Sequence, residues 1–491
     1  MDKITKIEDL LFNEEKRQED TINLIASENY ASKNILNACG NCIQNKYSEG
    51  KPNIKPVEYS DNDNFWYEEY NYKRYYAGCE NVDKIEIEAI KGVCKAFNTR
   101  YANVQPHSGS SANLQVYSAI CKYWNIKPNE LNLYGFSLNS MGHLTHGSNP
   151  SISGQWFNAE QLEIGEDGFI NYNVFEDKLR NQYPYKVFVI GFSAYPRQID
   201  YSKIAKIFKN NCKEETFILF DTSHISGLIV AGLHQNPMDY DYGKAIPVLS
   251  STTHKTLRMA RHAIITTNNY KLAKCVDSAV FPFTQGGALQ NMIAGIAIGF
   301  GEALKPSFKT YQEQVLKNIQ AMVEVFRDCG VKMITGGSDN HLILLDLKDE
   351  CFSGKDLETV LEKQGIITNK NAVQNDPKPK TETSGVRLGT ACITTRGATE
   401  EDAHEIAMLI CANIDYMRNH NGGVPDAMYE YGKKWVKEWC KNHPIYENDK
   451  DDICTLKIDE SLKKPLEKIK IPDVENEDSM KAVFEGCSLN D

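Results

Sequence analysis

The sequence predicts an α/β protein with a mostly parallel sheet in a large domain and a smaller α+β domain nearer the C-terminus. Short apolar runs alternate with segments of helical periodicity between residues 80 and 290, a pattern typical of parallel sheets covered by helices. A shorter mixture of strands and helices follows after residue 306. With 491 residues, the chain is long enough for two or three domains and a large buried core.

The strands and helices of the large domain follow from its hydrophobic pattern. Four short apolar runs predict buried strands, at residues 186–193, 216–221, 246–251 and 263–267. The segment 201–211 has apolar residues at helical spacing and predicts a helix that covers the sheet. Two long helices are expected next, one stopped near Pro306 and one that ends at Gly330.

The smaller domain is predicted from the alternation beyond these helices. Its expected strands are residues 332–337, 341–347 and 385–390, and its expected helices are residues 354–365 and 400–420. The whole chain is therefore divided into an N-terminal arm, a large domain, a small C-terminal domain and a polar tail, at residues 1–45, 46–305, 306–445 and 446–491. Residues 51–72 are polar, rich in aromatics and aperiodic, which indicates a surface insertion in the large domain.

Composition excludes several classes of function. The formal net charge of -11 argues against nucleic acid as a partner, because phosphate backbones require clustered Lys and Arg. The sequence has no apolar run long enough to span a membrane. Its first twenty residues are rich in Asp and Glu and resemble neither a signal nor a transit peptide. We therefore expect a cytoplasmic location and leave the mitochondrion open.

Cysteine and histidine pairs give no prediction of a metal site. The fourteen cysteines are scattered along the chain, which indicates reduced thiols and no disulfide framework. Cys39 and Cys42 form a C-x-x-C, but no second pair follows at zinc-site spacing. His143 and His146 likewise have no evident third ligand.

The first piece of candidate chemistry is Lys255, in the run STTHK that follows an apolar strand. In open α/β sheets the ligand crevice lies beyond the carboxyl ends of the strands. A lysine among hydroxyls and an imidazole can have a lowered pKa and form a Schiff base with an aldehyde. Taken alone, Lys255 also fits an ordinary solvated surface lysine.

Two further motifs lie at the ends of predicted elements, one at the end of a strand and one at the start of a helix. Asp221 ends the run TFILF and suits the ring nitrogen of pyridoxal phosphate, which must be protonated to accept electrons, although a helix cap is also compatible. Ser108, Gly109 and Ser110 precede a helical run, where free N–H groups and the helix dipole favour a phosphate. Ordinary capping also fits these three residues. The combination makes a fold-type-I pyridoxal-phosphate enzyme the leading class.

The same motifs carry a resemblance to a known family. The runs LIASENY, NKYSEG, KRYYAGCENVD, YANVQPHSGSSAN, GHLTHG, GFSAYPRQID, STTHKTLR and SGVRLGT occur in this order. They resemble the successive blocks of serine hydroxymethyltransferase between residues 22 and 400. The resemblance implies an aspartate-aminotransferase-like fold, a pyridoxal 5'-phosphate cofactor and tetrahydrofolate as co-substrate.

The resemblance also implies roles for individual residues. It assigns the Schiff base to Lys255 and the pyridine nitrogen to Asp221. The other implied cofactor residues are His143 against the ring, Ser108, Gly109 and Ser110 at the phosphate, His254 on the phosphate side, and Tyr47, Gly286 and Gly287. The remaining implied catalytic residues are Glu49 as acid and base, Tyr76, His224 and Thr252.

Substrate contacts are implied in the same way. Arg387 resembles the arginine that binds the substrate carboxylate, a task that suits a planar guanidinium, although a surface ion pair is the other interpretation. Ser27 is a further implied substrate-binding residue, expected with Tyr47 and Tyr76 as a neighbour of Glu49. Leu138, Gly142 and Asn371 match positions that contact folate. In the family, Tyr47, Glu49 and the two glycines act across a subunit interface, which implies a homodimer or homotetramer.

The implied function is a transferase of one-carbon metabolism. The reaction is the reversible transfer of the serine hydroxymethyl group to tetrahydrofolate, which gives glycine and 5,10-methylenetetrahydrofolate. Two alternatives stay open: a catalytically weak paralogue with folate-independent aldolase activity, and a non-catalytic regulatory subunit that keeps the fold.

These alternatives rest on departures from the family pattern. After Lys255 the family usually reads TLRGPRGG, whereas this chain reads TLRMARHA, so Met259 and His262 replace glycines. Added bulk there requires another path for the loop or a strained backbone. Met141 also replaces a glycine before Gly142, and it is expected to narrow the folate entry.

Overall fold

The structure is a computed structural model that describes residues 2–52 and 73–446. It consists of two compact units, one formed by Ala31–Gln312 and the other by Met1–Tyr30 together with Glu313–Asp491. The predicted surface insertion at 51–72 and the predicted tail at 446–491 lie, apart from their first residues, outside the described residues.

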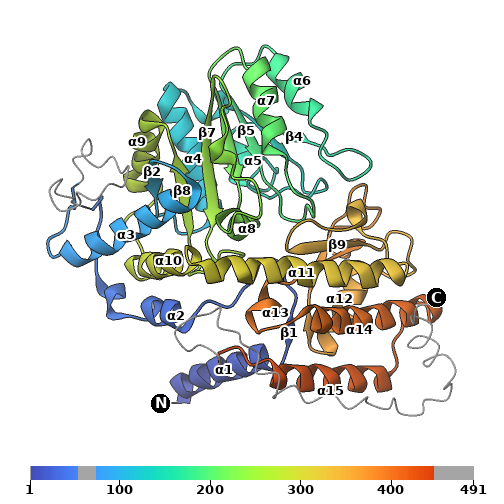
Figure 1. The fold of residues 1–491 in the computed structure, drawn as a ribbon. Helices are drawn as coiled ribbons and strands as arrows, with labels where there is room; N and C mark the ends of the chain where they lie inside the picture. Colours follow the sequence, from blue (N-terminus) through green and yellow to red (C-terminus); the bar gives the residue numbers. More distant parts are fainter. Residues whose placement is uncertain (1, 53–72, 447–491) are drawn as a thin grey trace. The chain divides into compact units, whose positions relative to one another are not determined.

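A seven-stranded sheet forms the centre of the Ala31–Gln312 unit (Figure 1). Its strand order is β2-β8-β7-β6-β5-β3-β4. The five strands from β7 to β4 are parallel, and β8 and β2 are added by antiparallel pairing. The predicted α/β class with a mostly parallel sheet is therefore confirmed. The strands are β2 (Tyr101–Asn103), β3 (Asn132–Phe136), β4 (Asn158–Leu162), β5 (Lys186–Ile190), β6 (Thr216–Asp221), β7 (Ala245–Thr252) and β8 (Ala263–Thr267).

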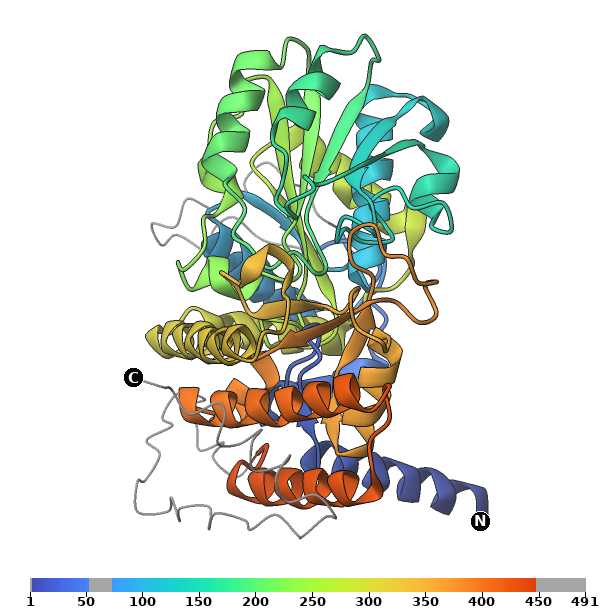
Figure 2. The ribbon, with the colours of Figure 1, turned by 90° about the vertical axis from the view of Figure 1, so that its right-hand side faces the viewer.

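Helices cover both faces of this sheet, with α4 (Gly109–Trp124) and α9 (Tyr270–Ser278) on one face and α6 (Asn173–Arg180) and α7 (Tyr201–Asn211) on the other (Figure 2). Successive strand residues point to opposite faces. Phe217 of β6 belongs to the buried cluster under α4 and α9, and Phe220 packs edge-on against Tyr201 of α7 at 5.3 Å between ring centroids. Because both faces are covered, the strands read as continuous apolar runs.

In the same unit, one helix contacts two others through small residues: α10 (Gln290–Ala303) packs against α2 (Lys33–Cys39) and α3 (Glu80–Phe97). A Cβ placed at Gly92 of α3 would lie 2.5 Å from Phe300 Cβ of α10, so glycine is what allows these two helices to approach closely. The short helices of this unit are α5 (Ile152–Trp156), α8 (Ser226–Val230), η1 (Cys42–Asn45), η3 (Pro128–Glu130), η4 (Pro237–Asp239) and η5 (Ala279–Thr284).

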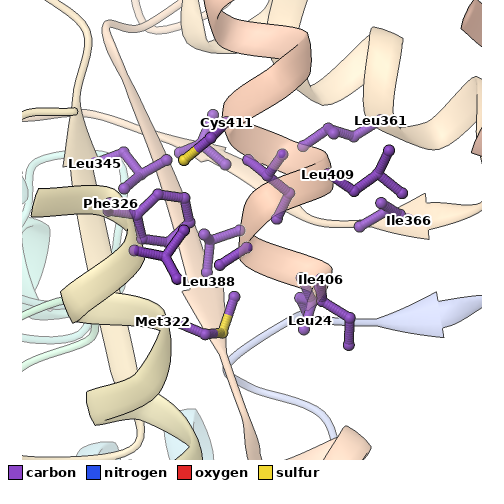
Figure 3. Packing of buried hydrophobic residues seen from close by; sticks show 14 of the residues in the cluster. Leu24, Met322, Phe326, Leu345, Leu361, Ile366, Leu388, Ile406, Leu409 and Cys411 are labelled. Carbon is purple, nitrogen blue, oxygen red and sulfur yellow. The ribbon is translucent and has the colours of Figure 1, made fainter. Parts of the chain in front are cut away.

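The second unit is built around a three-stranded antiparallel sheet in the order β11-β12-β9 and a parallel pair β1-β10. Its buried side chains come from strands and helices far apart in the sequence, as Figure 3 shows for Leu24, Phe326, Leu388 and Ile406. Its elements are α1 (Asp2–Glu19), β1 (Ile22–Asn23), the greater part of α11 (Pro306–Asp328), η6 (Ile334–Gly336), β9 (Leu342–Asp346), α12 (Gly354–Lys363), β10 (Ile366–Ile367), β11 (Asn369–Asn371), β12 (Gly385–Gly389), α13 (Ala391–Thr395), α14 (Glu400–Asn419) and α15 (Asp426–Asn442).

Two features of this unit differ from the sequence expectations. The predicted strand at 332–337 is wrong: only Met333 makes a bridge, to Leu345, and Thr335, Gly336 and Gly337 then adopt positive φ, which ends any extended run. Residues 1–30, expected within a separate arm, join the C-terminal unit through β1, and the division near residue 305 falls after Gln312. No helix among the described residues is long and apolar enough to cross a membrane.

Candidate active site

The carboxyl ends of β6 and β7 carry the two residues at the centre of the candidate site. β6 ends at Asp221, and its parallel neighbour β7 ends at Thr252, shortly before Lys255. The Thr252 N–H donates a 3.0 Å hydrogen bond to the Ser223 hydroxyl, which in turn donates to Asp221 Oδ1 at 2.6 Å. The segment that leads to Lys255 therefore starts beside the Asp221 carboxylate, as the sequence analysis requires.

Several donors converge on the Asp221 carboxylate. His146 Nε2 lies 3.0 Å from Oδ2, and the Asn113 amide of α4 donates to the same oxygen at 2.8 Å. Burial by itself raises the pKa of this carboxyl, but the hydrogen bond and charge of His146, the charge of His143 and the Ser223 hydroxyl together lower it well below its usual range. The carboxylate therefore stays ionised at neutral pH and suits a protonated ring nitrogen.

The first turn of α4 approaches the end of β7 closely. Ser108 caps the helix, with its Oγ accepting a 3.2 Å hydrogen bond from Ser111 N. A Cβ added at Gly109 would lie 2.6 Å from Thr252 Cγ2, so only glycine fits beside the strand end. Ser110 is exposed in the same turn. Free N–H groups at a helix start favour an anion, and this one lies next to the strand that leads to Lys255.

Two buried polar atoms beside Lys255 have no hydrogen-bond partner among the described residues: Thr252 Oγ1 and His254 Nδ1. Buried polar atoms are nearly always paired, so these two atoms point to a ligand. Burial, followed by the charges of Arg261 and Lys255, lowers the pKa of His254 to about 3. A neutral imidazole, a free hydroxyl, the α4 turn and an ionised Asp221 together fit the polar groups of pyridoxal phosphate.

The remaining predicted histidines of the pocket are held by nearby hydroxyls. His143 Nδ1 lies 2.8 Å from Thr145 Oγ1, which also accepts a 2.9 Å hydrogen bond from Asn113. This contact fixes the orientation of the His143 ring. His224 is buried, and its carbonyl accepts a 2.8 Å hydrogen bond from Thr256 Oγ1, which ties it to the loop after Lys255.

Five predicted residues from three separate segments meet in what we call the Tyr47–Glu49 cluster. The Tyr47 hydroxyl donates to Glu49 Oε1 at 3.3 Å, and the Tyr47 and Tyr76 rings lie 4.9 Å apart. A Cβ at Gly286 would lie 3.2 Å from Glu49 Oε1, and one at Gly287 would lie 3.5 Å from the Tyr47 ring. Tyr47 is 54% exposed and Tyr76 is 45% exposed, so the cluster lies at the surface of this chain.

A short backbone ladder holds the segment that carries Glu49. Gly50 and Arg74 form an antiparallel bridge, and the Lys51 N–H donates to the Lys73 carbonyl at 3.2 Å. A Cβ at Gly50 (φ +98°) would lie 2.2 Å from the Lys73 carbonyl oxygen, so glycine is required at this contact. The ladder joins the two chain ends that flank residues 53–72.

Arg74 fixes this ladder to the rest of the unit. Its guanidinium is buried and forms ion pairs with Asp83 and Glu86 of α3, each at 2.7 Å. The same group donates to the carbonyls of Ser48 and Gly50 at 2.8 and 2.9 Å. The backbone on both sides of Glu49 is therefore anchored to α3.

Ser27, which was expected beside Glu49, instead accepts a hydrogen bond from Arg387 in the other unit. Arg387 lies in β12 with 8% of its surface exposed, and it donates to Asn369 Oδ1 at 3.1 Å and to Ser27 Oγ at 3.4 Å. Burial lowers the pKa of Arg387 to about 10, which leaves it charged at neutral pH. A surface ion pair does not describe this buried guanidinium. Asn371 lies in β11 of the same sheet, where it pairs with Gly385.

Leu138 and Gly142 lie in the turn that follows β3. A Cβ at Gly142 would lie 2.0 Å from the Phe136 carbonyl oxygen, so the turn is closed too tightly for any other residue. Met141 adopts φ +63°, a left-handed conformation that is costly for a methionine, and its side chain is 2% exposed. The Met141 side chain is thus packed inside its unit, and Leu138 is partly exposed.

The altered loop after Lys255 is accommodated by glycines of α10. A Cβ at Gly299 would lie 2.4 Å from Met259 Cγ, and one at Gly295 would lie 2.8 Å from Ala260 Cβ. Of residues 256–263, only Arg258 has a positive φ, at +60°. Met259 and His262 therefore keep ordinary backbone angles. The side chains of Met259 and Ala260 pack against α10 at its glycines, Gly299 and Gly295.

Two residues that hold Asp221 were not predicted from the sequence. Asn113 is 108 positions away along the chain and His146 is 75 positions away. The only signal in the sequence is the pair His143 and His146, which gives no prediction of a metal site and does not point to Asp221. The structure instead gives His146 a hydrogen bond to the carboxylate.

Comparison with known proteins gives a consistent result over most of the chain. A family model described as serine hydroxymethyltransferase matches residues 1–410. The serine hydroxymethyltransferase of Wolbachia pipientis subsp. Culex pipiens is 41% identical over 431 residues, which cover 88% of this chain and 93% of the relative. That of Ehrlichia chaffeensis is 42% identical over 422 residues (85% and 92%), and serine hydroxymethyltransferase 2 of Ralstonia nicotianae is 41% identical over 438 residues (89% and 95%). This chain therefore belongs to the serine hydroxymethyltransferase family of fold-type-I pyridoxal-phosphate enzymes.

Proposed function

We propose that this protein is a transferase that moves the hydroxymethyl group of serine reversibly to tetrahydrofolate, giving glycine and 5,10-methylenetetrahydrofolate. The observation that carries the proposal is the placement of Asp221 and the Lys255 segment at neighbouring strand ends. The relatives that match most of this chain are named serine hydroxymethyltransferase. The family uses pyridoxal phosphate as cofactor and tetrahydrofolate as co-substrate.

The cofactor residues have distinct tasks in this proposal. When bound, pyridoxal phosphate supplies an electron sink for the pair released as the Cα–Cβ bond of serine breaks. Lys255 would hold the aldehyde carbon through its amine. The ionised Asp221 would accept a hydrogen bond from the protonated ring nitrogen, and His143 would pack on the ring. The task of Asp221 matches its hydrogen-bond partners and its lowered pKa.

The phosphate end is assigned to the first turn of α4. Ser108, Gly109 and Ser110 offer backbone N–H groups and hydroxyls at the positive end of a sixteen-residue helix. His254 and Thr252, whose buried Nδ1 and Oγ1 have no partner among the described residues, supply further hydrogen bonds to the cofactor or substrate. His224 lines the same strand-end region.

Substrate binding is assigned to a second set of residues. Arg387, with Ser27 as its neighbour, binds the serine carboxylate through two parallel hydrogen bonds. Leu138, Gly142 and Asn371 are the proposed folate contacts.

Glu49 is the proposed acid and base for the serine hydroxyl and the folate. Its carboxylate accepts a hydrogen bond from Tyr47 and lies beside Gly286, so it is partly shielded from water but not buried. Tyr47 and Tyr76 orient it.

We further infer that the Tyr47–Glu49 cluster serves the site of a second copy of this chain in a homodimer. Tyr47, Tyr75, Tyr76 and Phe283 are 54%, 71%, 45% and 69% exposed around it, an unusual amount of aromatic surface for a monomer. Mixing Glu49→Gln and Lys255→Ala chains tests this. Hybrid dimers keep one intact site of two, so about a quarter of wild-type activity returns from two inactive parents. No recovery would contradict a shared site.

The proposed reaction is tested by glycine formation from serine, with and without tetrahydrofolate, using purified protein loaded with pyridoxal phosphate. We expect glycine only with folate. Cleavage of allo-threonine without folate and no serine conversion would indicate the aldolase alternative. An unchanged visible absorbance of the bound cofactor in Lys255→Ala would indicate a regulatory subunit. The cytoplasmic location stays a prediction, which imaging of the tagged full-length protein would test.

A further inference from the structure

His262 occupies a fully buried position where the loop after Lys255 returns to the sheet. Its exposed fraction is 0%, and its Nε2 lies 3.1 Å from the Val104 carbonyl oxygen. The neighbouring Ala263 N–H donates to the Pro106 carbonyl at 3.2 Å, and the His262 carbonyl accepts from Thr253 N at 3.1 Å. His262 thus joins the loop after Lys255 to the segment at residues 104–106.

The hydrogen bond to Val104 fixes the state of the His262 ring. A carbonyl oxygen only accepts, so Nε2 must carry the hydrogen. Nδ1 is buried with no partner among the described residues, and burial together with nearby His107 lowers the pKa of His262 to about 3. The ring is therefore neutral. It donates one hydrogen bond to Val104 and fills buried space, and it carries no charge.

The segment that His262 holds leads directly into the phosphate turn. Val104 is followed by residues 105–107 and then by Ser108, the cap of α4. The ring of His107 lies 6.2 Å from that of His262. Gln105, which lies between Val104 and His107 in the sequence, has contacts of its own. Its N–H donates to Asn103 Oδ1, and its carbonyl accepts a hydrogen bond from the Gln285 amide. The described contacts thus anchor this segment residue by residue, with His262 at Val104.

We propose that His262 is a positioning residue for the phosphate group of the cofactor. It holds the Val104 carbonyl, and through residues 104–107 it sets the place of the 108–110 turn relative to β7. The inference rests on the proposed phosphate role of that turn. Nothing in the assigned set of active-site residues gives His262 a task, and it stands where the family pattern has a glycine.

The test compares His262→Gln with His262→Met in the full-length protein. The glutamine amide reaches the position of Nε2 and keeps a donor, whereas methionine fills similar space without one. Each cofactor-free variant is titrated with pyridoxal phosphate and, separately, with pyridoxal, which lacks the phosphate. The dissociation constants come from the absorbance of the bound ligand, and thermal unfolding of each cofactor-free protein is recorded alongside.

We expect His262→Met to bind pyridoxal phosphate about tenfold more weakly, because the buried Val104 carbonyl loses its donor. Binding of pyridoxal should change less than about twofold, and His262→Gln should stay near wild type for both ligands, because the donor to Val104 is retained. Equal loss for both ligands, or equal behaviour of the two variants, would overturn the proposal. If the methionine variant does not fold, His262→Ala replaces it, since it lacks the donor without adding bulk.

A variant of the turn separates the inference from its premise. Ser110→Ala removes an exposed hydroxyl of the proposed phosphate turn and nothing from the core. If it leaves the preference for pyridoxal phosphate over pyridoxal unchanged, the assignment of the turn fails, and the inference fails with it. If it lowers the preference and His262→Met does not, only the role of His262 is overturned.

Discussion

The strand-end region around Asp221 and the Tyr47–Glu49 cluster are built in different ways. Asp221 receives hydrogen bonds from Asn113, Ser223 and His146, and all of these side chains are buried or nearly so. The Glu49 carboxylate has one side-chain hydrogen bond, from a tyrosine that is 54% exposed. The donors around Asp221 are therefore buried and all come from this chain, whereas Glu49 has a firmly held backbone and an open side-chain environment.

This difference separates two kinds of requirement. A group that must keep one ionisation state is buried among fixed donors, because water and motion would weaken that control. A group that must take and release protons is not held in one ionisation state by fixed donors. The following changes test the contrast, in order of expected effect.

Asp221→Asn should cause the largest loss. It removes the negative charge that holds the ring proton, so we expect kcat to fall about a thousandfold, with weaker cofactor binding as well. Steady-state kinetics and the visible spectrum of the cofactor measure the two effects. Asn113→Ala, which keeps the carboxylate and removes one donor, should lose only about tenfold. Equal losses in both variants would contradict the importance of the charge.

Glu49→Gln should affect turnover without affecting the cofactor. We expect kcat to fall about a hundredfold through loss of proton transfer. The cofactor absorbance and the dissociation constant of pyridoxal phosphate should match wild type, because Glu49 lies outside the strand-end hydrogen bonds. A change in cofactor affinity as large as the change in kcat would mean that the two regions are not independent.

The packing beneath the loop after Lys255 gives a smaller effect on stability. In Gly299→Ala the new Cβ would lie 2.4 Å from Met259 Cγ, and we expect a loss of about 2 kcal/mol in the free energy of unfolding. Met259→Ala in the same chain should relieve it. Gly301→Ala is the matched control: it lies on the same helix with nothing within 4 Å, and it should stabilise by about 1 kcal/mol. Urea unfolding measures all four proteins.

The buried histidines give a pH dependence of known sign. The pKa values of His254 and His262 are both lowered to about 3 in the folded chain, so between pH 6.5 and 3 the unfolded chain binds more protons. The contribution of these two histidines to the free energy of unfolding is therefore fully present above pH 6.5 and decreases as the pH falls toward 3. At pH 5.5 each histidine should cost about 1.4 kcal/mol relative to pH 8. Urea unfolding of the cofactor-free proteins measures this effect. Between pH 8 and pH 5.5, the free energy of unfolding of His262→Gln should fall by about 1.4 kcal/mol less than that of wild type. An equal fall in both proteins would contradict a buried neutral His262.

The sequence predicted the elements whose pattern is local. The strands at 216–221 and 263–267 and the helix at 201–211 have the bounds expected from their apolar runs and spacing. The expected strand at 332–337 failed, because its two glycines and Thr335 turn the backbone through positive φ, which apolar content does not reveal. Motif positions placed Asp221 and Lys255 near strand ends for the same local reason.

What the sequence could not give are contacts over long separations. Asn113 and His146 hold Asp221 from positions 108 and 75 residues away, and no local pattern marks them as its partners. No local pattern shows that Gly299 makes room for Met259. The added bulk of the loop alone predicts strain, because the glycines of α10 that accommodate it lie far away in the sequence.

The backbone ladder at Lys51 and Lys73 has a consequence for how this chain can vary. Its two strands enter and leave residues 53–72 side by side, joined by a hydrogen bond, and Arg74 fastens them to α3. Closing a longer loop between fixed ends costs free energy only as the logarithm of its length. Extra residues inserted between Lys51 and Lys73 therefore add almost no strain to the flanking backbone. Insertions are expected to be tolerated here without a shift of the Glu49 carboxylate.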